Sequence, residues 1–155
     1  MDQADVTALL RPRRPIRGMS AVLLPYTAAG EIDWTAAEAH IERPCAAGLV
    51  PAVNMDTGYV QLISVSDQLR MLDLATSVTG GDFVAGADVP DAAGDPVDLP
   101  AYLVAAERIV ERGGTPVVFP SHGLNSLDDE GWVLALATIG EQVDRFIGFE
   151  LGPMF

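Results

Sequence analysis

The sequence contains no lysine. All nine of its basic residues are arginines, and they stand against 22 acidic residues, for a net charge of −13 at pH 7. Nucleic acids and anionic lipids are bound largely by basic residues that displace counterions, so a surface this acidic repels both. We therefore expect neither a nucleic-acid partner nor a membrane partner. The missing lysine also excludes lysine chemistry within these residues, because a guanidinium cannot replace a primary amine.

Cysteine and long apolar runs are equally scarce. The single cysteine, Cys45, excludes an internal disulfide, and its apolar surroundings predict a small buried side chain. No run approaches the roughly 18 apolar residues of a membrane span, and no signal-peptide core is present near the start. These features predict a cytoplasmic protein. Four arginines fall within residues 11–17, and we interpret residues 1–17 as a solvated arm before the first strand.

Five short segments rich in apolar and β-branched residues recur at intervals of 30 to 34 residues. Near-continuous apolar runs without polar alternation are typical of parallel strands that are buried on both faces. The sequence therefore predicts five such strands, at residues 19–24, 49–53, 83–87, 115–119 and 146–149.

Capping residues predict four amphipathic helices between these strands. Asp33, Ser64 and Asp98 are expected to cap the first three, each of which ends near a glycine. Pro44 is expected to kink the first helix or to end it early. Ser126 is expected to begin the fourth helix. The residues of this helix that should face inward are Trp132, Val133, Leu136 and Ile139.

Four βα units and a fifth strand predict an α/β fold with a parallel sheet. A (β/α)8 barrel needs about 250 residues, and five eighths of that is about 156, close to the 155 residues of this chain. We expect residues 18–155 to form the amino-terminal part of a (β/α)8 TIM barrel. An open flavodoxin-like sheet also fits this length, and strand order distinguishes the two. A sequential order indicates the barrel, and the order 2-1-3-4-5 indicates the open sheet.

Ligand sites of both architectures lie at the carboxyl ends of the strands. There Asp56-Thr57-Gly58 offers a hydroxyl and backbone N–H groups to an anion such as a carboxylate, and glycine allows close approach. A plain turn is the alternative, because these residue types favour turns for local reasons. Asp56, Asp88, His122 and Glu150 could converge on a divalent metal, although each is also a common polar residue at the end of a buried strand, and we assign no metal site. The alternative enzyme hypothesis is a metal-assisted lyase or isomerase that uses Asp88, His122 and Glu150. A third is a non-catalytic module that binds small anions.

Several segments, taken in order, resemble motifs of one enzyme family. Residues 24–34 are similar to an opening "TPF, then DG-x-I-D" segment. Residues 55–69 align without a gap on a "GTTGE, then L-S-x-x-E-R" segment, in which Thr57 and Gly58 match, Asp56 replaces the first threonine and Tyr59 replaces the glutamate. Residues 83–86 resemble a third strand with "V-I-A-G", and residues 117–120 resemble the fourth strand. Together these segments resemble the dihydrodipicolinate synthase and N-acetylneuraminate lyase family.

The resemblance implies a class I aldolase-like lyase or synthase that forms a Schiff base between a lysine and a keto acid, without a cofactor. It implies that Thr57 binds the carboxylate of the keto acid and relays a proton toward a tyrosine on the fifth strand. That tyrosine position falls on Phe149, which has no hydroxyl. Glu150 or His122 is the expected substitute.

In this family the Schiff-base lysine follows the sixth strand, after the last residue of this chain. We therefore expect a chain that stops before that lysine and is inactive alone. We also expect a homo-oligomer, because an open barrel exposes strand edges and apolar faces.

Overall fold

The computed structural model describes residue 13 and residues 15–149. Their five strands are β1 (Met19–Ala21), β2 (Val50–Val53), β3 (Val84–Ala87), β4 (Thr115–Val118) and β5 (Ile147–Gly148). The strands lie in one sheet in the order β1-β2-β3-β4-β5, and every neighbouring pair is parallel. This sequential order confirms the half-barrel. The flavodoxin-like alternative is wrong, because its order places the third strand beside the first, whereas here β3 pairs with β2.

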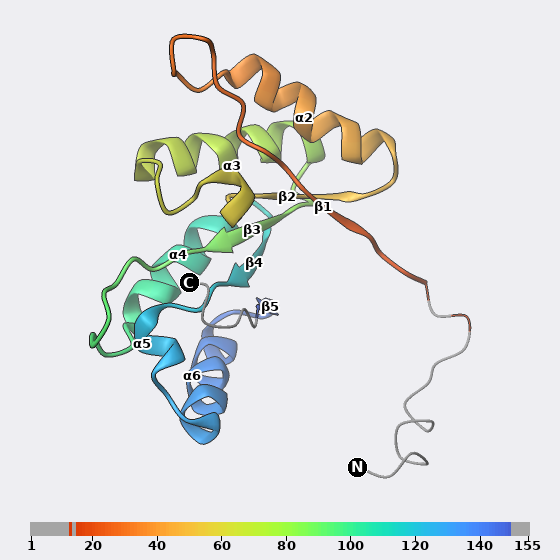
Figure 1. Ribbon diagram of the computed structural model, residues 1–155. Coiled ribbons are helices and arrows are strands. Elements are labelled where there is room, and N and C mark those ends of the chain that lie inside the picture. The colour runs from red at the N-terminus through yellow and green to blue at the C-terminus, as the bar shows by residue number, and fades with distance from the viewer. Residues whose placement is uncertain (1–12, 14, 150–155) are drawn as a thin grey trace.

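The helices are α2 (Trp34–Ala46), α3 (Val65–Thr79), α4 (Leu99–Val110), α5 (His122–Asn125) and α6 (Asp129–Gln142), with a 3-10 turn, η1 (Asp56–Gly58). They follow the strand order, from α2 and α3 at one end to α5 and α6 at the other (Figure 1). The caps predicted for the first three helices are confirmed, since Asp33, Ser64 and Asp98 each accept the amide three residues further on. The first helix ends two residues after Pro44.

The fourth predicted helix, α6, differs from the expectation. Asp128 caps it, whereas Ser126 ends the short helix α5 and donates its hydroxyl to the Gly123 carbonyl. Val133 is 68% exposed instead of inward. The buried residues of this helix are Ala135 and Ile139. Successive helical residues are about 100° apart, so Val133 lies about 200° from Ala135 and faces solvent.

The sheet has one apolar cluster on its inner face and two beneath the helices. Val84 belongs to the inner cluster, whereas Ala85 and Ala87 belong to an outer cluster that also contains residues of α2, α3 and α4. All residues of β2, β3 and β4 are buried, as the unbroken apolar runs predicted. The strands at the two edges, β1 and β5, contain exposed residues. Cys45 is half-buried at the margin of the cluster under α2, not buried as predicted.

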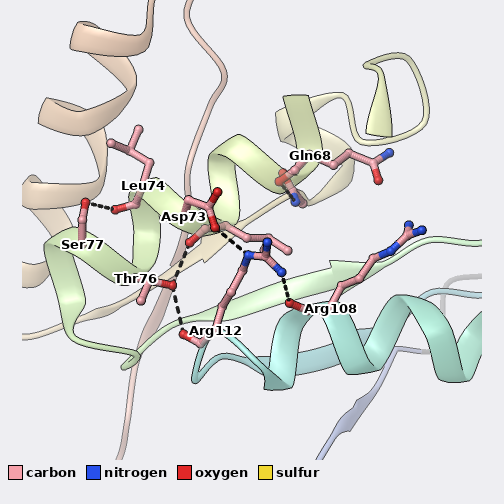
Figure 2. Close-up of polar contacts among 9 residues, drawn as sticks. Gln68, Asp73, Leu74, Thr76, Ser77, Arg108 and Arg112 are labelled. Carbon is pink, nitrogen blue, oxygen red and sulfur yellow. Dashed lines mark hydrogen bonds and ion pairs between the residues drawn. The ribbon is translucent and has the colours of Figure 1, made fainter. Parts of the chain in front are cut away.

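A polar network joins α3 to the end of α4 (Figure 2). Arg112 donates from Nε to Asp73 Oδ1 at 2.6 Å and from Nη1 to the Arg108 carbonyl at 2.9 Å. The Thr76 hydroxyl donates to the Arg112 carbonyl at 2.9 Å. Asp73 is largely exposed, so its ion pair contributes less than about 1 kcal/mol. The network nevertheless fixes the chain that enters β4 against the neighbouring unit.

Among the described residues, no helix combines the length and the apolar character that crossing a lipid bilayer requires.

Candidate functional site

The turn that carries the predicted anion site begins at Asn54. This residue directly follows β2 and has a left-handed conformation, with φ of +50°, which asparagine tolerates better than most residues. Its Nδ2 donates to the Gln68 carbonyl of α3 at 3.0 Å, which ties the turn to that helix. Its Oδ1 is buried and has no hydrogen-bond partner in the described part of the chain.

The Asp56–Gly58 turn follows directly. The amide of Gly58 donates to the Met55 carbonyl and the amide of Tyr59 donates to the Asp56 carbonyl, both at 2.9 Å. These two N–H groups therefore close the turn and are not free for an anion. A Cβ on Gly58 would lie 3.4 Å from the Val22 carbonyl, which places the turn beside the residue that follows β1.

The Thr57 hydroxyl is the unsatisfied group of this turn. Its Oγ1 is buried and makes no hydrogen bond within residues 15–149. A buried hydroxyl without a partner forfeits about 1–3 kcal/mol, and most such groups in folded proteins are satisfied. Thr57 can therefore donate to an acceptor that enters the carboxyl edge of the sheet.

Below this edge the inner face is closely packed and aromatic. The rings of Phe119 and Phe149 lie 5.4 Å apart at an angle of 55°. A Cβ on Gly86 would lie 2.1 Å from the Asn54 carbonyl oxygen and 2.4 Å from the Phe119 ring. The ends of β2, β3 and β4 can therefore meet here only because residue 86 is glycine. Phe149 lies on this inner face and has no proton to donate.

Asp91 fixes the loop of residues 88–98 onto α5. Its two carboxylate oxygens accept the amides of His122 at 2.8 Å and Gly123 at 2.7 Å. A Cβ on Gly123 would lie 2.6 Å from the loop backbone at Pro96. Burial alone would raise the pKa of Asp91. Hydrogen bonds from the Gly123 amide, the Ser121 hydroxyl and the His122 amide outweigh it and lower the pKa.

Asp88 lies three residues before Asp91 in a contrasting environment. It is half-buried, and its carboxyl makes no hydrogen bond or ion pair with another described residue. Burial raises the pKa of Asp88, and the charge of Asp91 raises it further.

The buried Tyr102 of α4 donates its hydroxyl to the Phe119 carbonyl at 2.5 Å. Burial raises the pKa of this tyrosine too.

The metal hypothesis finds no support. Over residue 13 and residues 15–149, no three His, Cys, Asp or Glu side chains gather closely enough to hold an ion. Asp56, Asp88 and His122 therefore do not form such a cluster, and Glu150 lies outside the described residues. The reason is local: His122 offers its backbone amide to Asp91 at the start of α5, and its exposed side chain is not drawn into a shared centre.

Comparison with known proteins identifies the fold. No family model and no curated protein matches this sequence. Among solved structures, a monomeric dihydrodipicolinate synthase variant superposes over 90% of this chain with a TM-score of 0.72 and 16% identity. The dihydrodipicolinate synthase of Acinetobacter baumannii, solved with pyruvate, covers 87% at a TM-score of 0.69 and 16% identity. That of Aquifex aeolicus covers 87% at 0.66 and 17% identity.

The chain has the fold of half a dihydrodipicolinate synthase. It spans about 45% of the length of each of these three solved structures. Enzymes built on (β/α)8 barrels hold their sites at the carboxyl ends of the strands. Here that edge carries Asp56, Thr57 and Gly58 in one turn, with Asp88 after β3 and His122 after β4.

Two features of this edge were not predicted from the sequence. One is the buried, unpartnered amide oxygen of Asn54. The other is the Asp91 carboxylate, which accepts two backbone amides at the start of α5. For Asn54, the local sequence shows only an asparagine at the end of a predicted strand. For Asp91, it shows only that Ser121 can cap a helix.

Proposed function

We propose that these residues form the carboxylate-binding part of a keto-acid site of a carbon–carbon lyase or synthase. The observation that carries the proposal is the buried Thr57 hydroxyl without a partner, at the carboxyl edge of a dihydrodipicolinate synthase fold. Thr57 as a whole is only half-buried, so rotation about its χ1 angle can present the hydroxyl to a ligand. The Acinetobacter baumannii structure, which contains pyruvate, makes pyruvate the natural first probe.

Thr57→Val tests this role, because valine keeps the shape and loses the hydroxyl. A hydrogen bond to a charged group is worth about 1.5–3 kcal/mol, so pyruvate should bind at least about tenfold more weakly. Thr57→Ser should keep most of the affinity. The exposed Thr35 of α2 provides the matched control, since Thr35→Val should leave binding unchanged. Equal affinity of Thr57→Val and wild type in an NMR titration would refute the role of Thr57.

We further propose that these 155 residues alone bind a keto acid but do not turn it over. They contain no lysine for a Schiff base, and Phe149 has no hydroxyl to relay a proton. Incubation with pyruvate and borohydride should therefore give no stoichiometric covalent adduct by mass spectrometry. A stoichiometric adduct would disprove this part of the proposal.

The edges of the sheet support a proposal about association. Within the described residues, β1 and β5 each pair on one side only, which leaves backbone donors and acceptors open. Met19 on β1 and Leu23 just beyond it are each about half exposed. We expect the chain to associate, and sedimentation velocity measures this. A single monomeric species at tens of micromolar would contradict it.

A further inference from the structure

The carboxyl of Asp88 is a half-buried group that the site described so far does not use. Residues along β3 alternate between the two sides of the sheet, with Val84 in the inner cluster and Ala85 and Ala87 in the outer one. Asp88 is two residues after Gly86 and four after Val84, so it lies on the same inner side of the sheet as these residues. The amide of Phe119, an inner residue, donates to the Ala87 carbonyl at 3.3 Å, which places Asp88 beside β4.

This position is directly linked to the Thr57 turn. Gly86, two residues before Asp88, is packed so closely against Asn54 that a Cβ would lie 2.1 Å from the Asn54 carbonyl oxygen. Asn54 begins the turn that carries Thr57 three residues later. Asp88 and Thr57 therefore extend from two neighbouring strands at a point where the strands are in contact, on the same edge of the sheet.

Two carboxyls in this region have opposite environments. Asp91 is fixed by two backbone amides and carries a stable negative charge. Asp88 has no donor among the described residues and lies close enough to Asp91 to feel its charge. When environments push the pKa values of two nearby acids apart, one serves as a fixed charge and the other as a proton donor or acceptor. In this pair Asp88, which no donor among the described residues holds in its charged form, is the group suited to take up a proton.

The charged groups at this edge strengthen this assignment. Beyond the effect of burial, the charge of Asp91 raises the pKa of Asp88, and the charge of Asp88 in turn raises the pKa of Tyr102, whose hydroxyl is engaged with the Phe119 carbonyl. Among the described residues, Asp56 after β2 and the exposed His122 of α5 lie on the same edge but do not cluster with Asp88. A ligand carboxylate that approaches Asp88 therefore meets the like charges of Asp88 and Asp91, and a proton on Asp88 removes part of the repulsion.

We propose that this site binds a keto-acid monocarboxylate together with one proton, and that the Asp88 carboxyl holds that proton where Phe149 supplies none. The proposal rests on the proposed function. In the binding step, the ionised Asp88 carboxylate, one proton from solvent and the keto-acid anion become a neutral Asp88 carboxyl with the anion bound, so charge and atoms balance. The net charge of the complex equals that of the free protein.

Isothermal titration of pyruvate into the whole chain tests the proposal between pH 5 and pH 8. Repeating each titration in two buffers with different ionisation enthalpies counts the protons taken up. Wild type should take up as much as one proton per pyruvate. Its affinity should fall by as much as about tenfold per pH unit above the pKa of free Asp88. Asp88→Asn should bind pyruvate with no proton uptake and with little dependence on pH.

Two control variants make the result specific. Asp144→Asn removes one charge at an exposed position after α6 and should behave as wild type. Thr57→Val should bind weakly at every pH. Because an aspartate with a raised pKa stabilises the fold below its unfolded pKa and loses that contribution as pH rises, Asp88→Asn should be at least as stable as wild type at pH 7. The variant therefore remains folded for the measurement.

The outcomes separate this proposal from the proposed function. Proton uptake in wild type that is absent from Asp88→Asn supports the role of Asp88. Binding with the same proton uptake in both proteins overturns that role and leaves the keto-acid site standing. No binding of pyruvate by wild type at any pH overturns both.

Discussion

Alanine at position 86 tests the packing that brings the site-bearing strands together. The added methyl group would lie 2.1 Å from the Asn54 carbonyl oxygen and 2.4 Å from the Phe119 ring. A ring can move aside, but the backbone carbonyl of the residue directly after β2 cannot do so without shifting that strand. Overpacking of a core lowers the free energy of unfolding by about 1–3 kcal/mol. Because one of the two obstacles is a backbone atom, we expect Gly86→Ala to lower it by about 3 kcal/mol. That is a large share of the roughly 5–15 kcal/mol available to a domain.

Urea unfolding followed by circular dichroism measures this loss. Gly148→Ala in β5 is the matched control, because its methyl group would lie 3.7 Å from Leu136, an ordinary van der Waals distance. The free energy of unfolding of this control should lie within about 0.5 kcal/mol of the wild-type value. If Gly86→Ala is no less stable than Gly148→Ala, the close approach of β2, β3 and β4 is not what the structure indicates.

Three further substitutions probe the supports of the site. Tyr102→Phe removes the buried 2.5 Å hydrogen bond to Phe119 and should lower the free energy of unfolding by about 1 kcal/mol, and an unchanged urea midpoint would contradict this. Ser64→Ala removes the cap of α3 and should also cost about 1 kcal/mol by urea unfolding, whereas a Ser64→Asp variant should not. Asp91→Asn should be less stable than wild type at pH 7. Because the folded pKa of Asp91 is lowered, its contribution is present above its unfolded pKa and is lost as pH falls through the folded value. The difference in melting temperature between wild type and Asp91→Asn should therefore be smaller at pH 3 than at pH 7. An equal difference at the two pH values would exclude this linkage.

Features that depend on local chemistry could be predicted from the sequence. The caps at Asp33, Ser64 and Asp98 were identified because a side chain and an amide three residues later satisfy each other without help from the rest of the fold. The buried strands were identified because covering both faces of a sheet leaves no polar positions. Strand order could not be chosen from length alone, since two architectures fit it.

Features that depend on distant contacts were missed. The helix α5 has four residues, too few to show a hydrophobic period, and without it the start of α6 was placed at Ser126 instead of Asp128. Asp91 is 31 residues from His122 in the sequence, so their hydrogen bond leaves no local pattern. The structure has a turn at Asp56–Gly58, where the sequence offered a turn or an anion site. Only the structure shows that the Gly58 amide is already used by the turn and the Thr57 hydroxyl is not.

The sequential strand order has a consequence for how the chain folds. Within the described residues, each strand pairs only with the strands before and after it in the sequence, so no pairing there has to close a long stretch of chain. Such an architecture behaves like a short array of repeats, in which stability is the sum of the units and their interfaces. Amide hydrogen exchange should then be slowest in β2, β3 and β4 and fastest in β1 and β5, with opening that starts at the two edges of the sheet and moves inward.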